Sequence, residues 1–464
     1  MAAAPATTSA PPAVQKIRYS QTQDRVRIVF DMDVLPEYNA SLVSQSPETN
    51  PDDLLRLVVD FSGTITQGVV PQMLFDDGVV NSLNLSESEA GKLSAVVDLK
   101  SAAAYKVFTL SSPNRLVIDI IKGYDRKVQQ EVMPGLKYTY LVRSLHDGPL
   151  TAYILDIDPA AGYGIKPALS NDEVVGLETL SPIAERASAV AAINGSYFAL
   201  SGDILGLLKI DGKIVSTPSL PRTAMGVMPD GKVLIDQVDY QGRVTLPDGQ
   251  QVAIGGVDCE RGPNSLILYN SYYNDSTGTN NYGIEYSIDD DKVTKISQGN
   301  TAIAPGGMVL SAHGTAADAL VKLKVGDTVK IQQTLGSALW DKTLYALGAG
   351  PTLVKNGGVY LTTTAEEFGS DVAGGRAPRT ALGVTKDGHV LLVVLDGRQS
   401  NSIGLTLLEL AKFMQELGSV DAMNLDGGGS SEMVIKGKVV NKPSDGRERR
   451  IGDALLVIPS KSAI

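Results

Sequence analysis

One aspartate, three glycines and two serines follow an apolar stretch near the end of the chain, in NLDGGGSSEMV (residues 424–434). Glycine loses more backbone freedom on folding than any other residue, so three in a row are costly. They allow backbone N–H groups to approach an anion or a sugar closely. We therefore expect Asp426 to lie at the floor of a ligand site. The loop residues expected to line it are Gly427, Gly428, Gly429, Ser430 and Ser431.

Three further apolar stretches end in the same way, with a glycine beside a polar side chain. They are AAINGSYF (191–198), ALGAGPTLV (346–354) and VVLDGRQSNSIG (393–404). One such ending is usually a tight turn, but four together favour a cleft lined by backbone. The residues expected at this cleft are Asn194, Tyr197, Gly350, Asp396 and Asn424.

Repeated arginines supply the opposite charge. PRTAMGVMPDGKVLI begins at Pro221 and PRTALGVTKDGHVLL begins at Pro378, with identical spacing. A third, weaker copy is MVIKGKVVNKPSDGRERRIGDALLV. The arginines that replace the R-T-A arginine in this copy are Arg447, Arg449 and Arg450. Planar guanidinium groups suit bidentate binding of phosphate or carboxylate, and surface salt bridges are the alternative. The arginines expected in this role are Arg222, Arg379 and Arg398.

Other chemistries are a poorer match to the sequence. No G-K-[ST] follows the glycines, as a P-loop requires, and the later glycine of a dinucleotide-binding fingerprint is absent. Cys259 is the one cysteine, so neither an intrachain disulfide nor a thiolate zinc site is expected. The histidines, His146, His313 and His389, have no metal-ligand spacing. We therefore expect acid–base chemistry on carboxylates and no cofactor, and the sequence leaves a metal requirement open.

Length and charge narrow the class of protein. The chain has 464 residues, too many for one hydrophobic core, so two or three domains are expected. A net charge of −11 argues against a nucleic-acid partner and against binding to an anionic membrane surface. No apolar run approaches the ~20 residues of a membrane-spanning helix, so no transmembrane segment is expected.

The pattern of elements predicts two domains. Residues 14–122 hold four β-branched runs with no helical period between them, which is typical of a small β-sandwich. Residues 1–13, rich in Ala, Pro and Thr, predict a flexible spacer, and the polar residues 123–135 predict a linker. Residues 136–464 alternate strands with a few helices. The expected fold class is α+β, an N-terminal β-sandwich followed by a larger mixed β-sheet domain with a few packed helices.

The clearest predicted helix begins after Thr406, in TLLELAKFMQELG. Thr406 and Glu409 form a T-x-x-E capping box, and Gly418 supplies the C-terminal stop. This helix immediately precedes the strand 420–425. We expect it to support the strand that leads into the glycine loop.

Residues 14–122 resemble an AMIN domain, an exported β-sandwich module of cell-envelope enzymes. The resemblance rests on DRVRIVFDMD with the following Pro36 and Tyr38, and on KVFTLSSPNRLVIDI. It implies binding to peptidoglycan or envelope glycans, and a spacer domain without a ligand is the alternative. The first residues lack the basic and apolar regions of a signal peptide. We expect an exported protein, periplasmic, in the cell envelope or extracellular, with a cytosolic protein as the alternative.

The later motifs resemble the phosphodiester glycosidase family, the domain of N-acetylglucosamine-1-phosphodiester α-N-acetylglucosaminidases. They are INGSYF, GAGPTLV, RAPRTALGV, VLDGRQS and NLDGGGSS, in that order, within about residues 134–459. NSLILYNSYYNDSTGTNNYGIEY (264–286) also resembles a family segment. Glu432 departs from the small or neutral residue expected there. The resemblance implies hydrolysis between an α-linked amino sugar and a phosphodiester, in a domain spanning 136–464.

The resemblance also implies roles for individual residues. Asp426 would be the principal catalytic carboxylate, with Asp396 as the first candidate for its partner and Glu285 as the second. Arg379 and Arg222 would hold the phosphate. The residues implied to bind sugar hydroxyls or the acetamido group are Asn194, Thr279, Asn424 and Ser430.

Two other functions remain open at this point. The protein could be a non-catalytic envelope glycan-binding protein, which the presence of Asp426 argues against. It could also be a glycosidase acting on glycans without phosphate, which needs a general acid with a raised pKa and fewer arginines.

Overall fold

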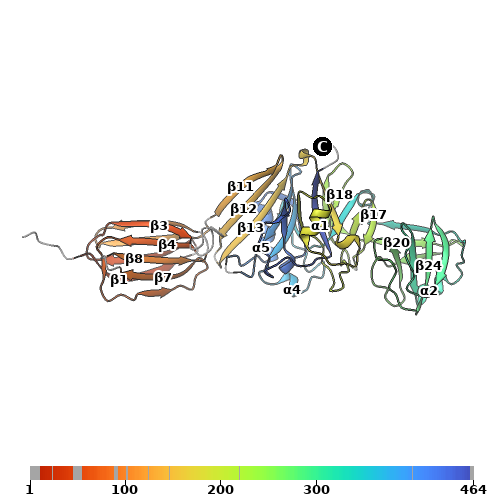
Figure 1. Ribbon diagram of the computed structural model, residues 1–464, viewed down its shortest axis with the longest axis horizontal. Coiled ribbons are helices and arrows are strands. Elements are labelled where there is room, and N and C mark those ends of the chain that lie inside the picture. Colours follow the sequence, from red (N-terminus) through yellow and green to blue (C-terminus); the bar gives the residue numbers. More distant parts are fainter. Residues whose placement is uncertain are drawn as a thin grey trace, which may run out of the picture. The chain divides into compact units, whose positions relative to one another are not determined.

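A computed structural model describes residues 11–22, 24–44, 55–87, 92–100, 103–123, 125–145, 147–218, 220–399 and 401–459. The chain divides into two compact units. The first comprises Met1–Val128, Tyr140–Ala152 and Gly397–Ile403, and the second comprises Gln129–Thr139, Tyr153–Asp396 and Gly404–Ile464. Strands predominate in both, with few and short helices (Figure 1). The expected spacer at 1–13 lies mostly outside the described residues, and Ala13 already begins a strand.

The first unit contains two five-stranded sheets, ordered β5-β1-β2-β10-β9 and β3-β4-β8-β7-β6. Their bounds are β1 Ala13–Gln21, β2 Arg25–Met32, β3 Tyr38–Ser44, β4 Leu55–Phe61, β5 Ile65–Thr66, β6 Gln72–Leu74, β7 Val80–Glu87, β8 Leu93–Leu99, β9 Ala104–Leu110 and β10 Arg115–Ile121. Alternate residues of β4 and β8 are buried, as expected for a strand with one face on a core. Side chains from both sheets form one buried cluster, in which the rings of Phe30 and Phe61 lie 5.4 Å apart.

The linker expected at 123–135 is largely a strand, β11 (Asp125–Met133). Most of its side chains are exposed, so its sequence carries no alternation of apolar and polar residues. A strand without a buried face cannot be told from a loop by its hydrophobic pattern. This is why the sequence predicted a linker here.

Three sheets of the second unit share one plan. Their orders are β17-β16-β28-β18-β19, β30-β29-β33-β31-β32 and β35-β34-β15-β36-β14, and the second of these is part of an eight-stranded sheet. Each contains a short hairpin, then a strand from another repeat, then the strand that carries the repeated R-T-A motif or its equivalent. The bounds are β14 Tyr163–Leu169, β15 Ala191–Asn194, β16 Leu208–Ile210, β17 Lys213–Ser216, β18 Arg222–Val227, β19 Val233–Val238, β28 Tyr345–Gly348, β29 Thr352–Lys355, β30 Gly358–Val359, β31 Arg379–Thr385, β32 Val390–Leu395, β33 Ser419–Asn424, β34 Met433–Ile435, β35 Lys438–Val439 and β36 Asp453–Pro459.

The registers show that the three sheets are internal repeats. Ala224 pairs with Gly348, Ala381 with Asn424, and Ala454 with Asn194. The same backbone hydrogen bond follows each pair. The N–H groups of residues 349, 425 and 195 donate to the carbonyls of residues 223, 380 and 453, at 3.0, 2.9 and 3.2 Å. Strands β28, β33 and β15 therefore end at equivalent positions in the three repeats, and so do the loops that follow them.

This register corrects the assignment of the third repeat. The arginine of R-T-A is Arg222 in β18 and Arg379 in β31, and its equivalent before β36 is Gly452. Asp453 then stands where the other copies have threonine. The arginines Arg447, Arg449 and Arg450 lie in the segment before this strand rather than at the motif position.

A further group of strands follows β19 in the second unit (green in Figure 1). It forms a three-stranded sheet, β21-β20-β27, and a five-stranded sheet, β22-β23-β26-β24-β25. The bounds are β20 Gln241–Thr245, β21 Gln251–Ile254, β22 Gly256–Val257, β23 Leu266–Asn270, β24 Gly283–Asp289, β25 Lys292–Ser297, β26 Met308–His313 and β27 Lys330–Thr334. These strands share a hydrophobic cluster of their own, which includes Tyr286 and Leu310. We call residues 241–334 the inserted lobe.

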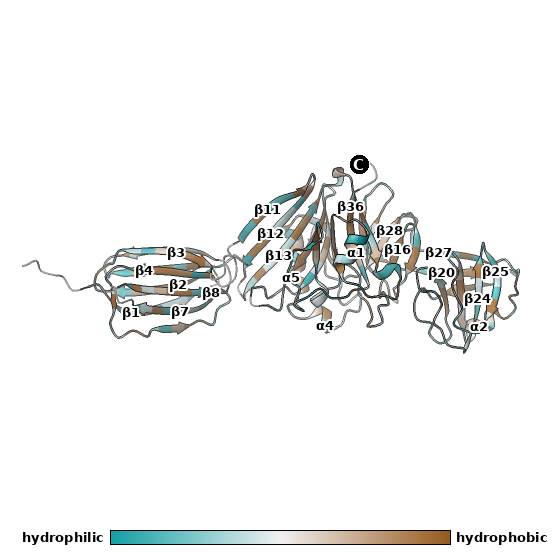
Figure 2. Ribbon diagram, in the orientation of Figure 1, coloured by the Kyte–Doolittle hydropathy of each residue, from teal (hydrophilic) through white to brown (hydrophobic). Residues whose placement is uncertain are grey.

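The helices are few. The longest is α5 (Leu407–Glu416), which has the predicted capping box between Thr406 and Glu409 and contacts β29 and β33. The others are α1 Leu180–Arg186, α2 Thr315–Leu320, α3 Ala338–Asp341 and α4 Ser370–Ala373. Figure 2 shows that apolar residues are concentrated along the strands of both units. Among the described residues, no helix has the length and apolar character needed to cross a membrane.

Candidate active site

The ends of β15, β28 and β33 come together through side-chain hydrogen bonds. Asn424 Nδ2 donates to Tyr197 Oη at 2.9 Å and to the Gly350 carbonyl at 3.2 Å. Tyr197 Oη donates to the same carbonyl at 3.1 Å. Asn194 Nδ2 donates to the Asp426 carbonyl at 2.6 Å. The structure therefore brings these five residues of the predicted cleft into one cluster.

Asp426 joins this cluster through its carbonyl group and is partly exposed. Its Oδ1 accepts a hydrogen bond from the Gly427 N–H at 2.8 Å. Burial raises the pKa of Asp426 to about 6, while the Ser430 hydroxyl, the Gly427 N–H and the positive charge of Arg449 oppose the rise. The pKa of this carboxyl group is therefore close to the neutral range, and the residue is partly accessible to solvent.

Backbone conformation and a neighbouring ion pair explain the glycines. Gly428 has φ 62°, a left-handed conformation that favours glycine. Its N–H donates to the Pro378 carbonyl at 2.9 Å. A Cβ on Gly429 would overlap the guanidinium of Arg449, which is paired with Asp445 at 2.7 Å. Gly429 therefore makes room for the side chain of Arg449, and not only for a ligand.

The loop also contains buried polar atoms with unused hydrogen-bonding capacity. Asn424 Oδ1, Ser431 Oγ and Glu432 Oε1 have no hydrogen-bond partner among the described residues. Ser430 Oγ likewise makes no well-formed hydrogen bond, although it is close enough to Asp426 to lower its pKa. Buried polar atoms are rarely left unsatisfied in folded proteins. Their concentration at residues 424–432 is consistent with a site that holds a polar ligand or water.

Asp453 is a second carboxyl group that the sequence did not predict. It is 1% exposed and accepts hydrogen bonds from the N–H and Oγ of Ser196, at 2.6 and 2.9 Å. Burial raises its pKa to about 7, and the charge of Asp426 adds to the rise. The two carboxyl groups therefore interact electrostatically. The available signal was its position in the third repeat, where the other two copies have threonine.

The two R-T-A arginines differ in their surroundings. Arg379 is 3% exposed, and its guanidinium donates to the carbonyls of Leu405, Val372 and Gly375 at 3.0, 3.1 and 3.2 Å. The Arg222 guanidinium has no hydrogen bond or ion pair with any residue that the structure describes, and it lies over the ring of Phe368. Burial raises the pKa of Tyr197, the charge of Asp426 adds to this, and the charges of Arg379 and Arg222 oppose it. Both arginines are therefore electrostatic neighbours of the Tyr197 hydroxyl.

Asp396 is connected to the glycine loop through Asn441. It is 1% exposed, and it accepts hydrogen bonds from Tyr153 Oη at 2.9 Å and from the Lys442 N–H at 3.1 Å. Asn441 Nδ2 donates to Asp396 at 3.3 Å and to the Ser431 carbonyl at 3.0 Å. Burial raises the pKa of Asp396 to about 6. These contacts favour a structural role for Asp396 over direct contact with a substrate.

Glu285 and Thr279 belong to the inserted lobe and do not join the cluster. Glu285 is fully buried and accepts hydrogen bonds from the hydroxyls of Thr279 and Ser311, at 2.6 and 2.7 Å, and from the Thr301 N–H at 2.9 Å. Burial opposes its ionisation, but these hydrogen bonds outweigh it and lower its pKa. All these partners of Glu285 lie within the inserted lobe, and no interaction joins Glu285 or Thr279 to Asp426 among the described residues.

Arg398 is also outside the cluster. Its side chain is exposed, and Gly397–Ile403 group with the first compact unit. The structure therefore gives no support for a role at the glycine loop.

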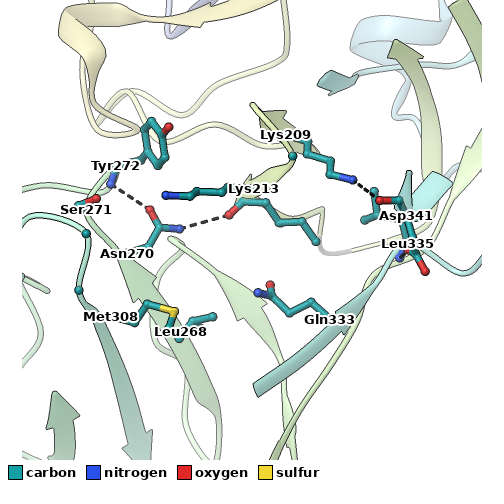
Figure 3. Close-up of a pocket in the computed structure, with 14 residues that line it drawn as sticks. Lys209, Lys213, Leu268, Asn270, Ser271, Tyr272, Met308, Gln333, Leu335 and Asp341 are labelled. Carbon is teal, nitrogen blue, oxygen red and sulfur yellow. Dashed lines mark hydrogen bonds between the residues drawn. The ribbon is translucent and has the colours of Figure 1, made fainter. Parts of the chain in front are cut away.

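A cleft of about 440 Å³ lies elsewhere in the second unit (Figure 3). Its lining includes Lys209, Lys213, Asn270, Tyr272 and Gln333, and none of the residues that surround Asp426. Lys209 Nζ donates to the carbonyl of Asp341, another residue of the lining, at 2.9 Å. The described residues contain no group of three or more His, Cys, Asp or Glu side chains able to hold a metal ion.

Comparison with known proteins gives the class of this region. Residues 282–458 match the family model "Phosphodiester glycosidase". The match includes Arg379, Asp426 and Asp453, and it excludes Asn194 and Arg222. At the level of the family, residues 282–458 are thus similar to a glycosidase, which is a hydrolase.

Two curated proteins are similar to parts of the chain. One is N-acetylglucosamine-1-phosphodiester alpha-N-acetylglucosaminidase of Mus musculus, 35% identical over 102 residues, which are 20% of this chain and 20% of that protein. The other is SPbeta prophage-derived uncharacterized protein YomE of Bacillus subtilis (strain 168), 39% identical over 80 residues, which are 17% of this chain and 12% of that protein. The matches thus span a fifth or less of these relatives.

A solved structure shares the fold over nearly the whole chain. It is that of a hypothetical protein from Synechocystis, with a TM-score of 0.66 and 22% sequence identity. The alignment covers 97% of this chain and 81% of that one. At this identity the similarity concerns the fold alone.

Proposed function

We propose that this protein is a glycoside hydrolase that releases an α-linked N-acetylhexosamine from a phosphodiester. The observation that carries the proposal is the position of Asp426. It is a partly exposed carboxyl group whose charge acts on the Tyr197 hydroxyl, and the charges of Arg379 and Arg222 act on the same hydroxyl. The family match of residues 282–458 supports this reaction class.

The site offers what such a reaction needs. A phosphomonoester is a good leaving group, and a guanidinium that binds its oxygens stabilises the charge that develops as the bond breaks. The sugar acquires oxocarbenium character, which the Asp426 carboxylate stabilises. A water oxygen then bonds to the anomeric carbon, the C–O bond to phosphate breaks, and Asp426 accepts the proton lost by water. Asn194, Tyr197, Asn424 and Ser430 would bind the polar groups of the sugar.

Asp453 replaces Asp396 and Glu285 as the proposed partner of Asp426. Catalysis by two carboxyl groups needs different protonation states in the two. Asp426 and Asp453 have pKa values of about 6 and about 7. Because Asp453 is buried behind Ser196, we propose that it positions the Asp426 loop and adjusts its charge, and does not itself contact the sugar.

The first unit would be an accessory domain. We propose that residues 14–122 form an AMIN-like β-sandwich that binds peptidoglycan or a related envelope glycan, and that the protein acts outside the cytoplasm. The two sheets with a shared cluster of apolar residues, and the resemblance in DRVRIVFDMD, support this. Pull-down with purified peptidoglycan tests it, and a first unit that stays in the supernatant would contradict it.

The experiment for the catalytic proposal compares two substrates with the same sugar. One is an N-acetylglucosamine α-1-phosphodiester with a methyl group on the phosphate, and the other is p-nitrophenyl α-N-acetylglucosaminide. We expect sugar release from the phosphodiester with the higher kcat/KM, and loss of release in Asp426→Asn. A preference for the p-nitrophenyl substrate would favour a glycosidase for glycans without phosphate. Binding of sugar without release from either would favour a non-catalytic glycan-binding protein.

A further inference from the structure

We infer that residues 361–376 form a substrate-recognition loop in which Phe368 positions the Arg222 guanidinium to bind an oxyanion. The inference rests on the proposed function, because it assigns the anionic half of the proposed substrate. It concerns Phe368 and Glu366, which neither the sequence motifs nor the comparisons single out. Loop 361–376 follows β30 and contains helix α4 (Ser370–Ala373).

Glu366 fixes the start of this loop to the strand that carries Arg222. It is 1% exposed. It accepts hydrogen bonds from the N–H and Oγ1 of Thr223, at 2.9 and 2.5 Å, from the Thr352 N–H at 3.2 Å, and from Thr362 Oγ1. Thr223 is the residue next to Arg222. The loop is therefore attached at the base of the arginine that it would position.

Arg379 fixes the other end of the loop. Its guanidinium donates to the carbonyls of Val372 and Gly375. Gly350 has φ 82° and faces Glu366 and Phe368 of the loop. A Cβ on Gly350 would overlap the Glu366 carboxylate. Hydrogen bonds thus hold the loop near both of its ends.

Phe368 lies between these anchors and stacks on Arg222. The guanidinium carbon of Arg222 lies 4.1 Å from the centroid of the Phe368 ring. The ring of Phe368 lies 5.7 Å from that of Tyr197, whose hydroxyl contacts Asn424. Stacking fixes the plane of a guanidinium through its π face and leaves its N–H donors available.

The internal repeat strengthens this conclusion. Arg222 and Arg379 occupy the same position in two repeats, yet Arg379 uses its donors on backbone carbonyls. The Arg222 guanidinium makes no hydrogen bond or ion pair within the described part of the chain. One copy therefore holds the loop, and the other presents an oriented guanidinium. A phosphate or carboxylate oxygen pair is the ligand chemistry that such a group recognises.

Binding measurements on the full chain separate this role from catalysis. The probes are N-acetylglucosamine 1-phosphate and N-acetylglucosamine, titrated by calorimetry into wild type, Phe368→Ala and Phe368→Tyr. We expect Phe368→Ala to weaken binding of the phosphorylated sugar about tenfold, with little change for the neutral sugar. Phe368→Tyr keeps an aromatic ring and should bind the phosphorylated sugar as the wild type does. Tyr360→Ala is the matched control, because Tyr360 is an aromatic residue near the loop that is 58% exposed.

The outcomes are distinguishable from those of the proposed function. Equal losses for both sugars, no loss, or no binding of the phosphorylated sugar by wild type would overturn the inference. If Phe368→Ala does not fold, Phe368→Leu, which keeps an apolar side chain without a π face, replaces it with the same expected selective loss. The wild type could lack hydrolytic activity while Phe368→Ala selectively weakens binding of the phosphorylated sugar. That result would support the inference and contradict the proposed function. The wild type could instead hydrolyse the phosphodiester while its binding of the phosphorylated sugar is unchanged in Phe368→Ala. That result would support the proposed function and contradict the inference.

Discussion

Gly429 lies directly against the guanidinium of Arg449, at a position where any larger residue would overlap it. The charge of Arg449 lowers the pKa of Asp426, three residues before Gly429, against the effect of burial. The glycine is therefore linked to the ionisation of the carboxylate through an arginine. This relationship gives a measurable consequence in the pH profile.

Gly429→Ala should displace Arg449 and so raise the pKa of Asp426 further above its value of about 6. Because the reaction needs the ionised carboxylate, kcat/KM rises with pH through this pKa. The variant should move that limb to higher pH, and Arg449→Ala should move it in the same direction. The measurement is kcat/KM from pH 4.5 to 8.5. An unshifted limb in both variants would show that Arg449 does not act on Asp426.

Gly428→Ala should act through the backbone, because Gly428 has φ 62°. Forcing a residue with a Cβ into this conformation costs ~1–2 kcal/mol, so the thermal midpoint should fall. Binding of sugar should weaken as the loop relaxes. A midpoint equal to that of wild type would show that the loop accepts another conformation.

Asp426→Asn removes the charge and keeps the shape of the side chain. We expect kcat to fall by about 10³ or more, with the thermal midpoint and sugar binding largely retained. Kinetics on the methyl phosphodiester and a thermal unfolding curve check both halves. Near-normal kcat would place the catalytic carboxylate elsewhere, and unfolding of the variant would give Asp426 a structural role.

Glu432 should make the protein less stable as pH rises. Burial raises its pKa to about 9, and Glu448 adds to the rise, so the folded protein holds a proton that the unfolded chain releases near pH 4.5. The stabilising contribution is complete below that lower pKa and is lost as pH rises toward about 9. Relative to wild type, Glu432→Gln should therefore gain ~1 kcal/mol or more in free energy of unfolding between pH 5 and pH 8. A pH-independent difference in urea denaturation would contradict this.

Arg379→Ala and Arg222→Ala should separate stability from recognition. Arg379 is buried and donates to three backbone carbonyls, so its removal should cost ~3 kcal/mol or more of stability. Arg222 supports no such network, so its removal should leave the thermal midpoint within a few degrees and raise KM for the phosphodiester. The reverse pattern would mean that Arg379, and not Arg222, is the phosphate-binding residue, whereas the sequence suggested both.

Residues 123–464 should fold without residues 1–122. The apolar cluster of the first ten strands is drawn almost wholly from those strands. A truncation at residue 136, which the expected linker would suggest, removes strand β11 and should be less stable than one that begins at residue 123. Soluble, active protein from residues 123–464 would agree with this, whereas aggregation of that fragment would show that the first unit is needed for folding.

Local chemistry made parts of this structure predictable from sequence. The capping box of α5 and the ends of β15, β28 and β33 depend on residues close together in the chain. Glu285 illustrates the limit, because its segment resembles a family motif and yet its partners lie within the inserted lobe. No short sequence pattern shows that the partners of Glu285 lie within the inserted lobe.

Asp453 and Phe368 were missed for another reason. Asp453 stands in the most degenerate repeat, where only strand register shows its equivalence to threonine. Phe368 lies in an irregular segment without periodicity, and its role depends on contacts with Tyr197 and Arg222 far away in the chain. The position of Asp453 depends on long-range strand register, and that of Phe368 depends on how its loop is anchored. A short sequence motif encodes neither feature.

The exchange of strands among the three related sheets has a consequence for how the second unit folds. Because β28 completes the sheet of β16 and β18, β33 that of β29 and β31, and β15 that of β34 and β36, no repeat can satisfy its own backbone hydrogen bonds. Separate repeats would expose unpaired strand edges, which favour aggregation. Partly assembled forms of these sheets should therefore be scarce at equilibrium, and their slowest amide protons should exchange together, at one rate shared by all three.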